Sequence, residues 1–226
     1  MPIYKKVNVD FFKKWDADMA YILGFFAADG NMVPTKRGTH FVSFTSMDES
    51  ILLNIRTVMQ SEHKLSKRVS QTGRVYRFQM GSKAMYDDLY KLGFTGNKSK
   101  RMIMPDIPKQ FQSDFIRGYF DGDGNVWVGM LNKNRKTPTN AIQVAFTSGS
   151  KVFLEGLLSL LNNKGIKGGS IYSSKTKNFS RLQLSTSDAL KLYEIMYNGQ
   201  PKLYLQRKKL RFDQFRLKRS ANNRIK

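Results

Sequence analysis

The chain has 226 residues and 40% of them are hydrophobic, which is enough for one large core or two domains of about 100 residues each. Cysteine is absent. That excludes a disulfide scaffold and thiolate-ligated zinc or iron–sulfur sites, and it fits an intracellular, reducing compartment. No apolar run approaches the roughly 18 residues of a membrane span, and no signal peptide is visible.

The charge is the most informative part of the composition. Lys and Arg number 39 against 17 Asp and Glu, so the formal net charge is +22. A folded chain this basic needs an anionic partner to offset its self-repulsion, and nucleic acid is the leading candidate. An anionic membrane surface is the alternative. The basic residues are spread over strand-like and loop-like segments instead of one amphipathic helix face, so we expect no membrane partner.

The first predicted helix has a second copy further along the chain. Residues 20–31, AYILGFFAADGN, resemble residues 114–125, DFIRGYFDGDGN, and Asp29 and Asp123 are 94 residues apart. Both segments are mostly apolar and both end in Asp-Gly-Asn. This is the pattern of a repeat, which decides the fold class before any other feature.

The elements that follow also occur twice in the same order. Strands are predicted over 40–46 and 141–148, and both end in Phe-Thr-Ser. Helices follow over 48–63 and 150–164, with Ser46 and Ser148 as predicted N-caps. Later strands over 74–80 and 180–184 and closing helices over 82–92 and 187–197 complete the two copies.

We therefore predict an α+β fold of two pseudo-symmetric α-β-β-α-β-β-α repeats, each with an antiparallel saddle-shaped sheet and packed through their first helices. The predicted domains are 1–100 and 113–226. The connector 101–112 is ordered, because it carries prolines at 105 and 108.

The ends of the first helices carry the candidate chemistry. Gly24 and Gly118 stand at matching positions and would let the two backbones approach closely. Asp29 and Asp123 would then emerge side by side, where two carboxylates need a cation to compensate their repulsion. Oxygen ligands without cysteine or clustered histidine favour Mg²⁺ or another hard divalent ion.

Two simpler interpretations compete with a metal site. Each Asp could merely end a helix before a glycine turn, but the matched pair in a chain of charge +22 favours the metal. Residues 121–125 also begin like a calcium-binding loop, yet Val126 and Asn132 stand where such a loop needs Gly and Glu.

The two segments resemble the paired signature of the LAGLIDADG homing endonucleases in their single-chain form, over residues 22–30 and 116–124. The resemblance implies a monomer that cuts both strands of a long DNA target with Mg²⁺ or a similar ion. It implies metal binding by Asp29 and Asp123, with Ala28 and Gly122 beside them. It leaves open an intron maturase that binds RNA, or a DNA-binding protein that does not cleave.

The sequence departs from the family pattern at three places. Ala27 stands where the second repeat has Asp121, a position that is not a metal ligand in the family. Ser46 and Ser148 stand at the place of a family glutamine near the scissile phosphate. The family's catalytic lysine after the third helix is best matched by Lys98 and Lys208; Lys100 and Lys209 compete, and simple phosphate contact is the alternative role.

One face of each sheet is expected to contact DNA, because side chains alternate along a strand. In the later strands, Arg-x-Gln occurs in both repeats on the side opposite the apolar residues, and Arg and Gln can read guanine and adenine in the major groove. A core role is as compatible with Trp127 as an outward one. The predicted DNA-contacting residues are Asn31, Val33, Ser43, Thr45, Arg77, Gln79, Asn125, Trp127, Gln143, Thr147, Arg181 and Gln183.

Overall fold

The computed structural model describes residues 5–35, 38–70, 73–96, 100–174 and 176–224. The chain divides into two compact units, residues 1–122 and 123–226, and each is described by itself. The first unit includes most of the second signature helix. None of the helices in the described ranges is long and apolar enough to cross a membrane.

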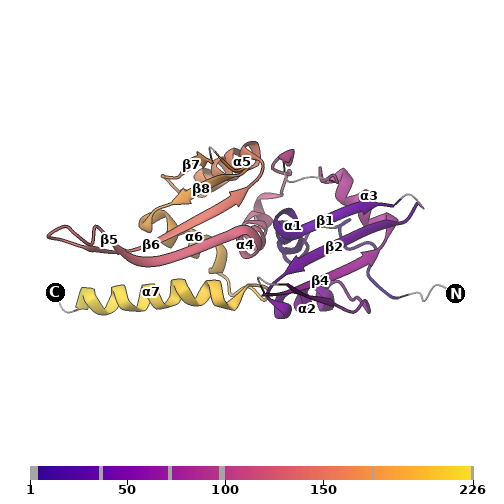
Figure 1. Ribbon diagram of the computed structural model, residues 1–226, viewed down its shortest axis with the longest axis horizontal. Coiled ribbons are helices and arrows are strands. Elements are labelled where there is room, and N and C mark those ends of the chain that lie inside the picture. Colours follow the sequence, from indigo (N-terminus) through magenta and orange to yellow (C-terminus); the bar gives the residue numbers. More distant parts are fainter. Residues whose placement is uncertain (1–4, 36–37, 71–72, 97–99, 175, 225–226) are drawn as a thin grey trace. The chain divides into compact units, whose positions relative to one another are not determined.

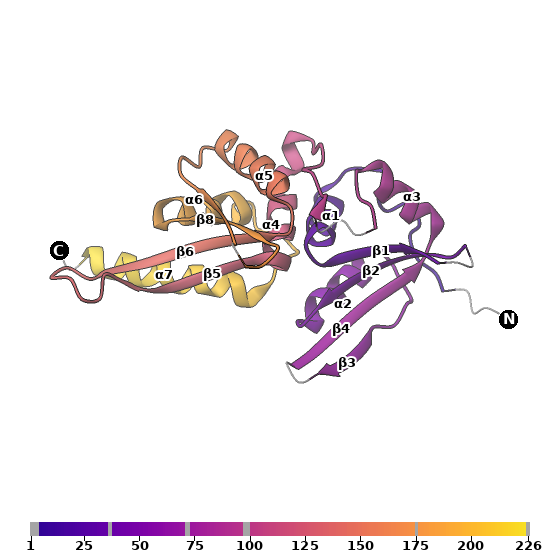
Figure 2. The same ribbon diagram turned by 45° about the horizontal axis from the view of Figure 1, so that its top comes forward.

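The first repeat has the predicted order of elements (Figure 1). Its strands form one antiparallel sheet in the order β1-β2-β4-β3 (Figure 2). The elements are α1 (Ala17–Asp29), β1 (Gly30–Pro34), β2 (His40–Ser46), α2 (Glu49–Val58), β3 (Ser66–Ser70), β4 (Gly73–Gly81) and α3 (Lys83–Lys91).

The second repeat follows a short 3-10 turn, η2 (Lys109–Phe111), and has the same topology. Its sheet order is β5-β6-β8-β7, again antiparallel. The elements are α4 (Gln112–Asp123), β5 (Gly124–Leu131), β6 (Thr139–Ser148), α5 (Lys151–Asn163), β7 (Ser170–Ser173), β8 (Ser180–Leu184), α6 (Thr186–Tyr197) and α7 (Gln206–Arg224). The predicted α+β fold of two repeats is confirmed.

Helix α1 is the centre of the first unit. The Asp16 side chain caps its start by accepting a 2.7 Å hydrogen bond from the amide of Met19, and every residue from Met19 to Ala27 is buried. A Cβ on Gly24 would lie 2.1 Å from the carbonyl oxygen of Phe115, and one on Gly118 would lie 1.9 Å from that of Tyr21. Only glycine permits this approach, so α1 and α4 cross with their backbones in contact, as predicted.

The N-caps of the second helices were predicted wrongly. Helix α5 begins after Ser150, whose hydroxyl accepts from the Phe153 amide, and α2 begins after Asp48. Ser46 and Ser148 lie two residues earlier, and their hydroxyls accept hydrogen bonds of 3.1 Å from the amides of Asp48 and Ser150. Each serine therefore stabilises the turn that leads into the helix instead of capping the helix itself.

The segment between the repeats is anchored by apolar side chains, with Met102 and Ile107 both 4% exposed. The compact unit 1–122 reaches beyond this segment because α4 packs on α1. The predicted domain limits, 1–100 and 113–226, were drawn from the sequence repeats and not from packing. They stay a prediction.

Helix α7 was not predicted. It spans 19 residues and buries Phe212 and Phe215 within the second unit. At its first turns Asp213 accepts hydrogen bonds from the Tyr193 hydroxyl at 2.6 Å and the Lys209 ammonium at 2.8 Å. Arg216 adds an ion pair with Glu194 at 3.0 Å. The contacts with Tyr193 and Glu194 fasten α7 to α6, whereas the Lys209–Asp213 pair lies within α7.

Candidate metal site and nucleic-acid face

Asp29 is the last residue of α1, and its carboxylate lies beside α4. A Cβ on Gly122 would stand 3.4 Å from Oδ2 of Asp29 and 2.3 Å from the Cβ of Ala28. The absence of a side chain at Gly122 thus makes room for Ala28, next to Asp29 in α1. Asp29 is partly exposed, whereas Ala27, two residues earlier, is buried.

The second signature has two acidic residues, and the structure separates their roles. Asp121 is 3% exposed, and its Oδ2 accepts a 2.7 Å hydrogen bond from the Tyr21 hydroxyl. Asp123, which ends α4, is partly exposed like Asp29. The carboxylate engaged inside the helix crossing is therefore Asp121, and Asp123 is the one that reaches the surface.

Asp29 in the first unit and Asp123 in the second each offer carboxylate oxygens, the ligand type that a hard divalent cation prefers. Within the described ranges, no cluster of three or more His, Cys, Asp or Glu could hold a metal by itself. A cation here would take further oxygens from water or from a bound phosphate, as Mg²⁺ commonly does.

The candidate lysines fall into different environments. Lys98 lies outside the described residues, and Lys100 is exposed. Lys208, in the first turn of α7, is 5% exposed. Its neighbour Lys209 bonds Asp213, and its Nζ lies within 5.7 to 5.9 Å of three tyrosine rings. Lys209 is thus engaged with Asp213 and the tyrosine rings, and the assignment of Lys208 as the functional lysine stays a prediction.

In the first sheet the antiparallel register aligns the predicted DNA-face residues in rows. Asn31 pairs with Ser43, which pairs with Gln79; Thr45 pairs with Arg77 in the next row. Arg77 is exposed, and its guanidinium donates a 3.4 Å hydrogen bond to the Ser43 hydroxyl. Val33 is 42% exposed.

Ser43 is the exception among these residues, because its side chain is only 2% exposed. It lies on the expected face, and its hydroxyl accepts the hydrogen bond from the Arg77 guanidinium. The burial of Ser43 argues against direct contact with DNA, and that contact stays a prediction.

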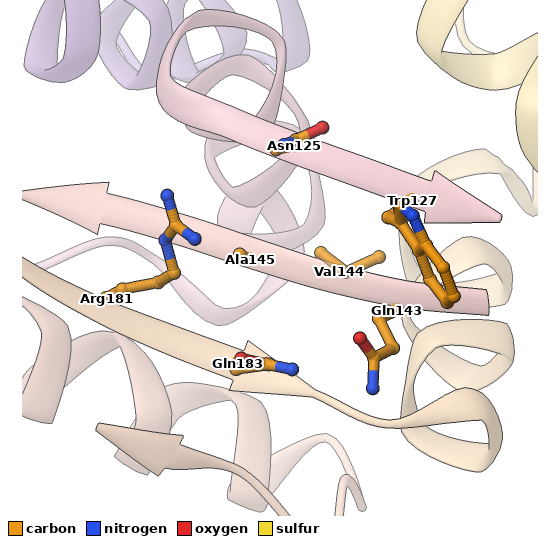
Figure 3. A pocket seen from close by; sticks show the side chains of 7 residues that line it. All are labelled: Asn125, Trp127, Gln143, Val144, Ala145, Arg181 and Gln183. Atoms are coloured by element: carbon orange, nitrogen blue, oxygen red, sulfur yellow. The ribbon is translucent and has the colours of Figure 1, made fainter. Parts of the chain in front are cut away.

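In the second sheet the corresponding row is Asn125, Ala145 and Gln183, and Thr147 pairs with Arg181. The small Ala145 leaves a hollow of about 260 Å³, which Figure 3 shows from close by. Five predicted residues surround it. They are Asn125, Trp127, Gln143, Arg181 and Gln183.

Trp127 faces outward and is 40% exposed, so the core alternative is wrong. Its ring lies across Gly129, where a Cβ would come within 2.4 Å of the indole. Trp127 is thus a wall of the hollow with its ring supported from the same strand. The matching residue in the first repeat is Val33, so the two faces differ in shape.

The third strand of each sheet adds residues that the sequence prediction missed. Register places Ser66 and Arg68 on the face of Arg77, and Ser170 and Tyr172 on the face of Arg181. Tyr172 is directly opposite Arg181 and is 59% exposed. Extending the strand alternation through the second hairpins was the signal that could have found them.

Comparison with known proteins identifies both repeats. The profile of the LAGLIDADG-like domain family matches residues 16–92 and 110–197. The DNA-directed RNA polymerase subunit Rpo1C of Methanocaldococcus jannaschii is 31% identical over 180 residues, which are 76% of this chain but 18% of that protein. The chain thus spans under a fifth of this curated relative.

Solved structures of the same fold are homing endonucleases. A structure of mesophilic variants of I-DmoI has a TM-score of 0.55 at 18% identity and covers 85% of this chain and 98% of its own. I-WcaI bound to its DNA recognition sequence has a TM-score of 0.57 at 20% identity and covers 90% of both chains. I-DmoI in complex with DNA and Mn has a TM-score of 0.56 at 17% identity, covering 86% of this chain and all of its own.

Proposed function

Since the chain belongs to the LAGLIDADG-like domain family, we propose that it is a site-specific homing endonuclease that breaks both strands of a long DNA target. The observation that carries this proposal is the chemistry at the two helix ends. Asp29 and Asp123 end equivalent helices and are partly exposed, while Asp121 is buried and bonded to Tyr21. A pair of acids kept at the surface of a chain of charge +22 is suited to binding a cation at a phosphate.

The two sheet faces hold the duplex and the helix ends carry the reaction. Exposed Arg77 and Arg181 contact base edges or phosphates of the two half-sites. Asp29 and Asp123 would bind divalent cations, Mg²⁺ in the cell, and Ala28 and Gly122 are the neighbouring residues that we assign to the same site. When bound, such an ion neutralises charge on the scissile phosphate and lowers the pKa of a water that attacks it. Lys208 places a positive charge where negative charge develops on the phosphate oxygens.

The ligands of similar proteins support the proposal that this chain binds DNA and a divalent metal ion. I-DmoI has been solved with DNA and Mn and with DNA and Ca, and I-LtrWI has been solved bound to target DNA. By analogy we propose a monomer that takes double-stranded DNA and a hard divalent cation.

The test is cleavage of a pool of random duplexes with Mg²⁺, followed by sequencing of the new ends, with EDTA as the metal-free control. Asp29→Asn and Asp123→Asn keep the shape of the side chains but remove the charge that binds metal. We expect either variant to lose double-strand cleavage or to nick one strand at most, and to retain DNA binding through the sheets.

An Asp that only ended a helix would tolerate Asn, which is a good residue at that position. Full Mg²⁺-dependent cleavage by Asp29→Asn would therefore remove the proposed active site. A wild-type chain that binds duplex DNA but never cuts it would support the non-cleaving alternative instead.

A further inference from the structure

The hairpin β5–β6 is longer than its counterpart in the first repeat. The strands β1 and β2 pair from Gly30↔Phe44 to Pro34↔His40, over five pairs. The strands β5 and β6 begin at the equivalent Gly124↔Phe146 and continue over eight pairs to Leu131↔Thr139. The three extra pairs and the turn they carry, residues 129–141, are called the arm below.

The arm projects beyond the rest of the second sheet. Strand β8 accompanies β6 only as far as Val144, and the Thr186 hydroxyl bonds the backbone of β6 at Ile142. In the first sheet, a single backbone hydrogen bond, from the Thr35 amide to the Thr39 carbonyl, follows the last β1–β2 pair, and the amide of Ser82 bonds the carbonyl of His40 from the β4 side. The arm therefore has no equivalent within the β1–β2 pairing.

A two-stranded ribbon alone is marginally stable in water, so a long arm needs support. Helix α7 supplies it: the helix packs on β5 and runs alongside β5 and β6 in both views (Figures 1 and 2). The buried Phe212 and Phe215 and the Asp213 bonds to Tyr193 and Lys209 hold α7 in the second unit. In the described part of the first repeat, α3 is followed by the connector and not by a helix comparable in length to α7.

The tip of the arm is basic. Lys133, Arg135 and Lys136 lie in the turn between the strands and are exposed. Three cations on a supported ribbon that continues the DNA face of the sheet are suited to phosphates at the end of a half-site.

We propose that the arm, backed by α7, extends the DNA contact of the second repeat beyond that of the first, so that the target is bound asymmetrically. This inference rests on the proposed DNA-binding function. Three residues of strand cover about 10 Å at roughly 3.3 Å each, and base pairs are stacked about 3.4 Å apart. The longer half-site therefore gains about three base pairs.

The test uses the target selected above in four forms: full length, and shortened by three base pairs at one end, the other end, or both. Binding is measured by fluorescence anisotropy with Asp29→Asn, so that the duplex stays intact. We expect shortening at one end to weaken binding roughly ten-fold, the scale of a few lost phosphate contacts, and shortening at the other end to change it little.

Removing the positive charges of the arm tests whether the second repeat causes the dependence of binding on one end of the duplex. The triple variant Lys133→Gln, Arg135→Gln, Lys136→Gln is expected to bind the full duplex as weakly as the protein with an intact arm binds the duplex shortened at its sensitive end. Shortening that end should then weaken the binding of the triple variant no further. The matched control, Lys151→Gln with Lys191→Gln, removes exposed charges from α5 and α6 and should keep the end dependence. A second variant replaces residues 129–141 by Asn-Gly, a two-residue hairpin turn that leaves five strand pairs, as in the first repeat, and should also lose the end dependence.

Equal sensitivity to shortening at both ends would overturn the inference, as would an end dependence that survives the triple variant. Either result leaves the proposed function intact if the wild-type chain still cuts the full target with Mg²⁺. A chain that does not bind duplex DNA would contradict the proposed function and the arm inference together.

Discussion

The Tyr21 hydroxyl donates a 2.7 Å hydrogen bond to Oδ2 of Asp121 inside the crossing of α1 and α4. The positions that match these two residues in the other repeat are Phe115 and Ala27, which are both apolar and buried. The Arg117 guanidinium also lies 5.3 Å from the centre of the Tyr21 ring and bonds Asp114 at 2.7 Å. The crossing between two similar helices is therefore polar on one side only, which distinguishes α4 from α1.

This asymmetry predicts energetic coupling between Tyr21 and Asp121. Tyr21→Phe should lower the free energy of unfolding by about 1–3 kcal/mol, because it takes a donor away from a buried carboxylate. The double variant Tyr21→Phe with Asp121→Ala recreates the Phe–Ala chemistry of the matching positions, so it should lose less than the sum of the single variants. Urea denaturation of the four proteins measures the coupling. Strictly additive losses would show that the bond contributes nothing of its own.

Most of the fold could be predicted because its signals are local and duplicated. The apolar residues of α1 end at an Asp-Gly pair that recurs 94 residues later, and the alternation around Phe78 and Leu182 gives the buried side of both sheets correctly. Arg77 and Arg181 are accordingly exposed.

The features that the sequence did not predict depend mainly on contacts between residues far apart in the chain, which leave little local pattern. Helix α7 offers only Phe212 and Phe215 as fully buried aromatic residues in a run rich in Lys and Arg, so its amphipathic signal is weak. Ser43 is buried on a face predicted to be open, and its hydrogen-bond partner, Arg77, comes from another strand. Arg68 and Tyr172 were missed for a different reason, because the strand alternation that indicates their faces was not extended to β3 and β7.

Arg181 lines the hollow around Ala145, where it could contact the edge of a base. Arg181→Ala should relax base preference in one half-site, at a cost of roughly 1–3 kcal/mol per lost bidentate contact, and Arg77→Ala should do so in the other. Selection from a randomised target with each variant measures the position of the change. Uniform weakening on all sequences would mean that these arginines hold phosphates and do not read bases.

Two adjacent lysines of α7 should have different roles, Lys208 in cleavage and Lys209 in stability. Lys208→Met is expected to slow cleavage about 100-fold or more, the scale of losing one charge-stabilising donor, with DNA binding largely retained. Lys209→Met should instead lower the stability of the second unit, because the Lys209 ammonium bonds Asp213 and lies 5.7 Å from the rings of Tyr193 and Tyr197 in α6, and should leave cleavage by the folded protein near the wild-type rate. Single-turnover rates and urea denaturation, measured on both variants, separate the two outcomes. A normal rate for Lys208→Met would remove this lysine from the proposed site.

The anchor of α7 also predicts how stability depends on pH. Burial by itself would raise the pKa of the Asp213 carboxyl, but the hydrogen bonds from Lys209 and Tyr193 outweigh it and hold the pKa below its ordinary value. A depressed pKa in the folded state contributes stability that is present above the unfolded value of about 3.9 and is lost as the pH falls through the folded value.

The pKa of Lys209 is shifted in the complementary direction. Its hydrogen bond to Asp213 raises the pKa, although burial opposes the change. A raised pKa contributes stability that is fully present below the unfolded value, about 10.4, and is lost as the pH rises through the folded value. The anchor should therefore stabilise the second unit between about pH 4 and pH 10 and weaken on either side.

Asp213→Asn tests this anchor, because asparagine keeps the shape but cannot form the ion pair. At pH 7 the variant should unfold more easily by on the order of 1–3 kcal/mol, the usual range for hydrogen bonds to a charged group. The difference from the wild type should shrink as the pH falls below about 4, where the wild-type carboxyl is neutralised too. Urea denaturation at several pH values between 3 and 9 measures it, with Asp87→Asn as the control, since Asp87 pairs with Lys83 on the exposed surface of α3. A loss that stays the same at pH 3 and pH 7 would show that the charge of Asp213 does not hold α7 in place.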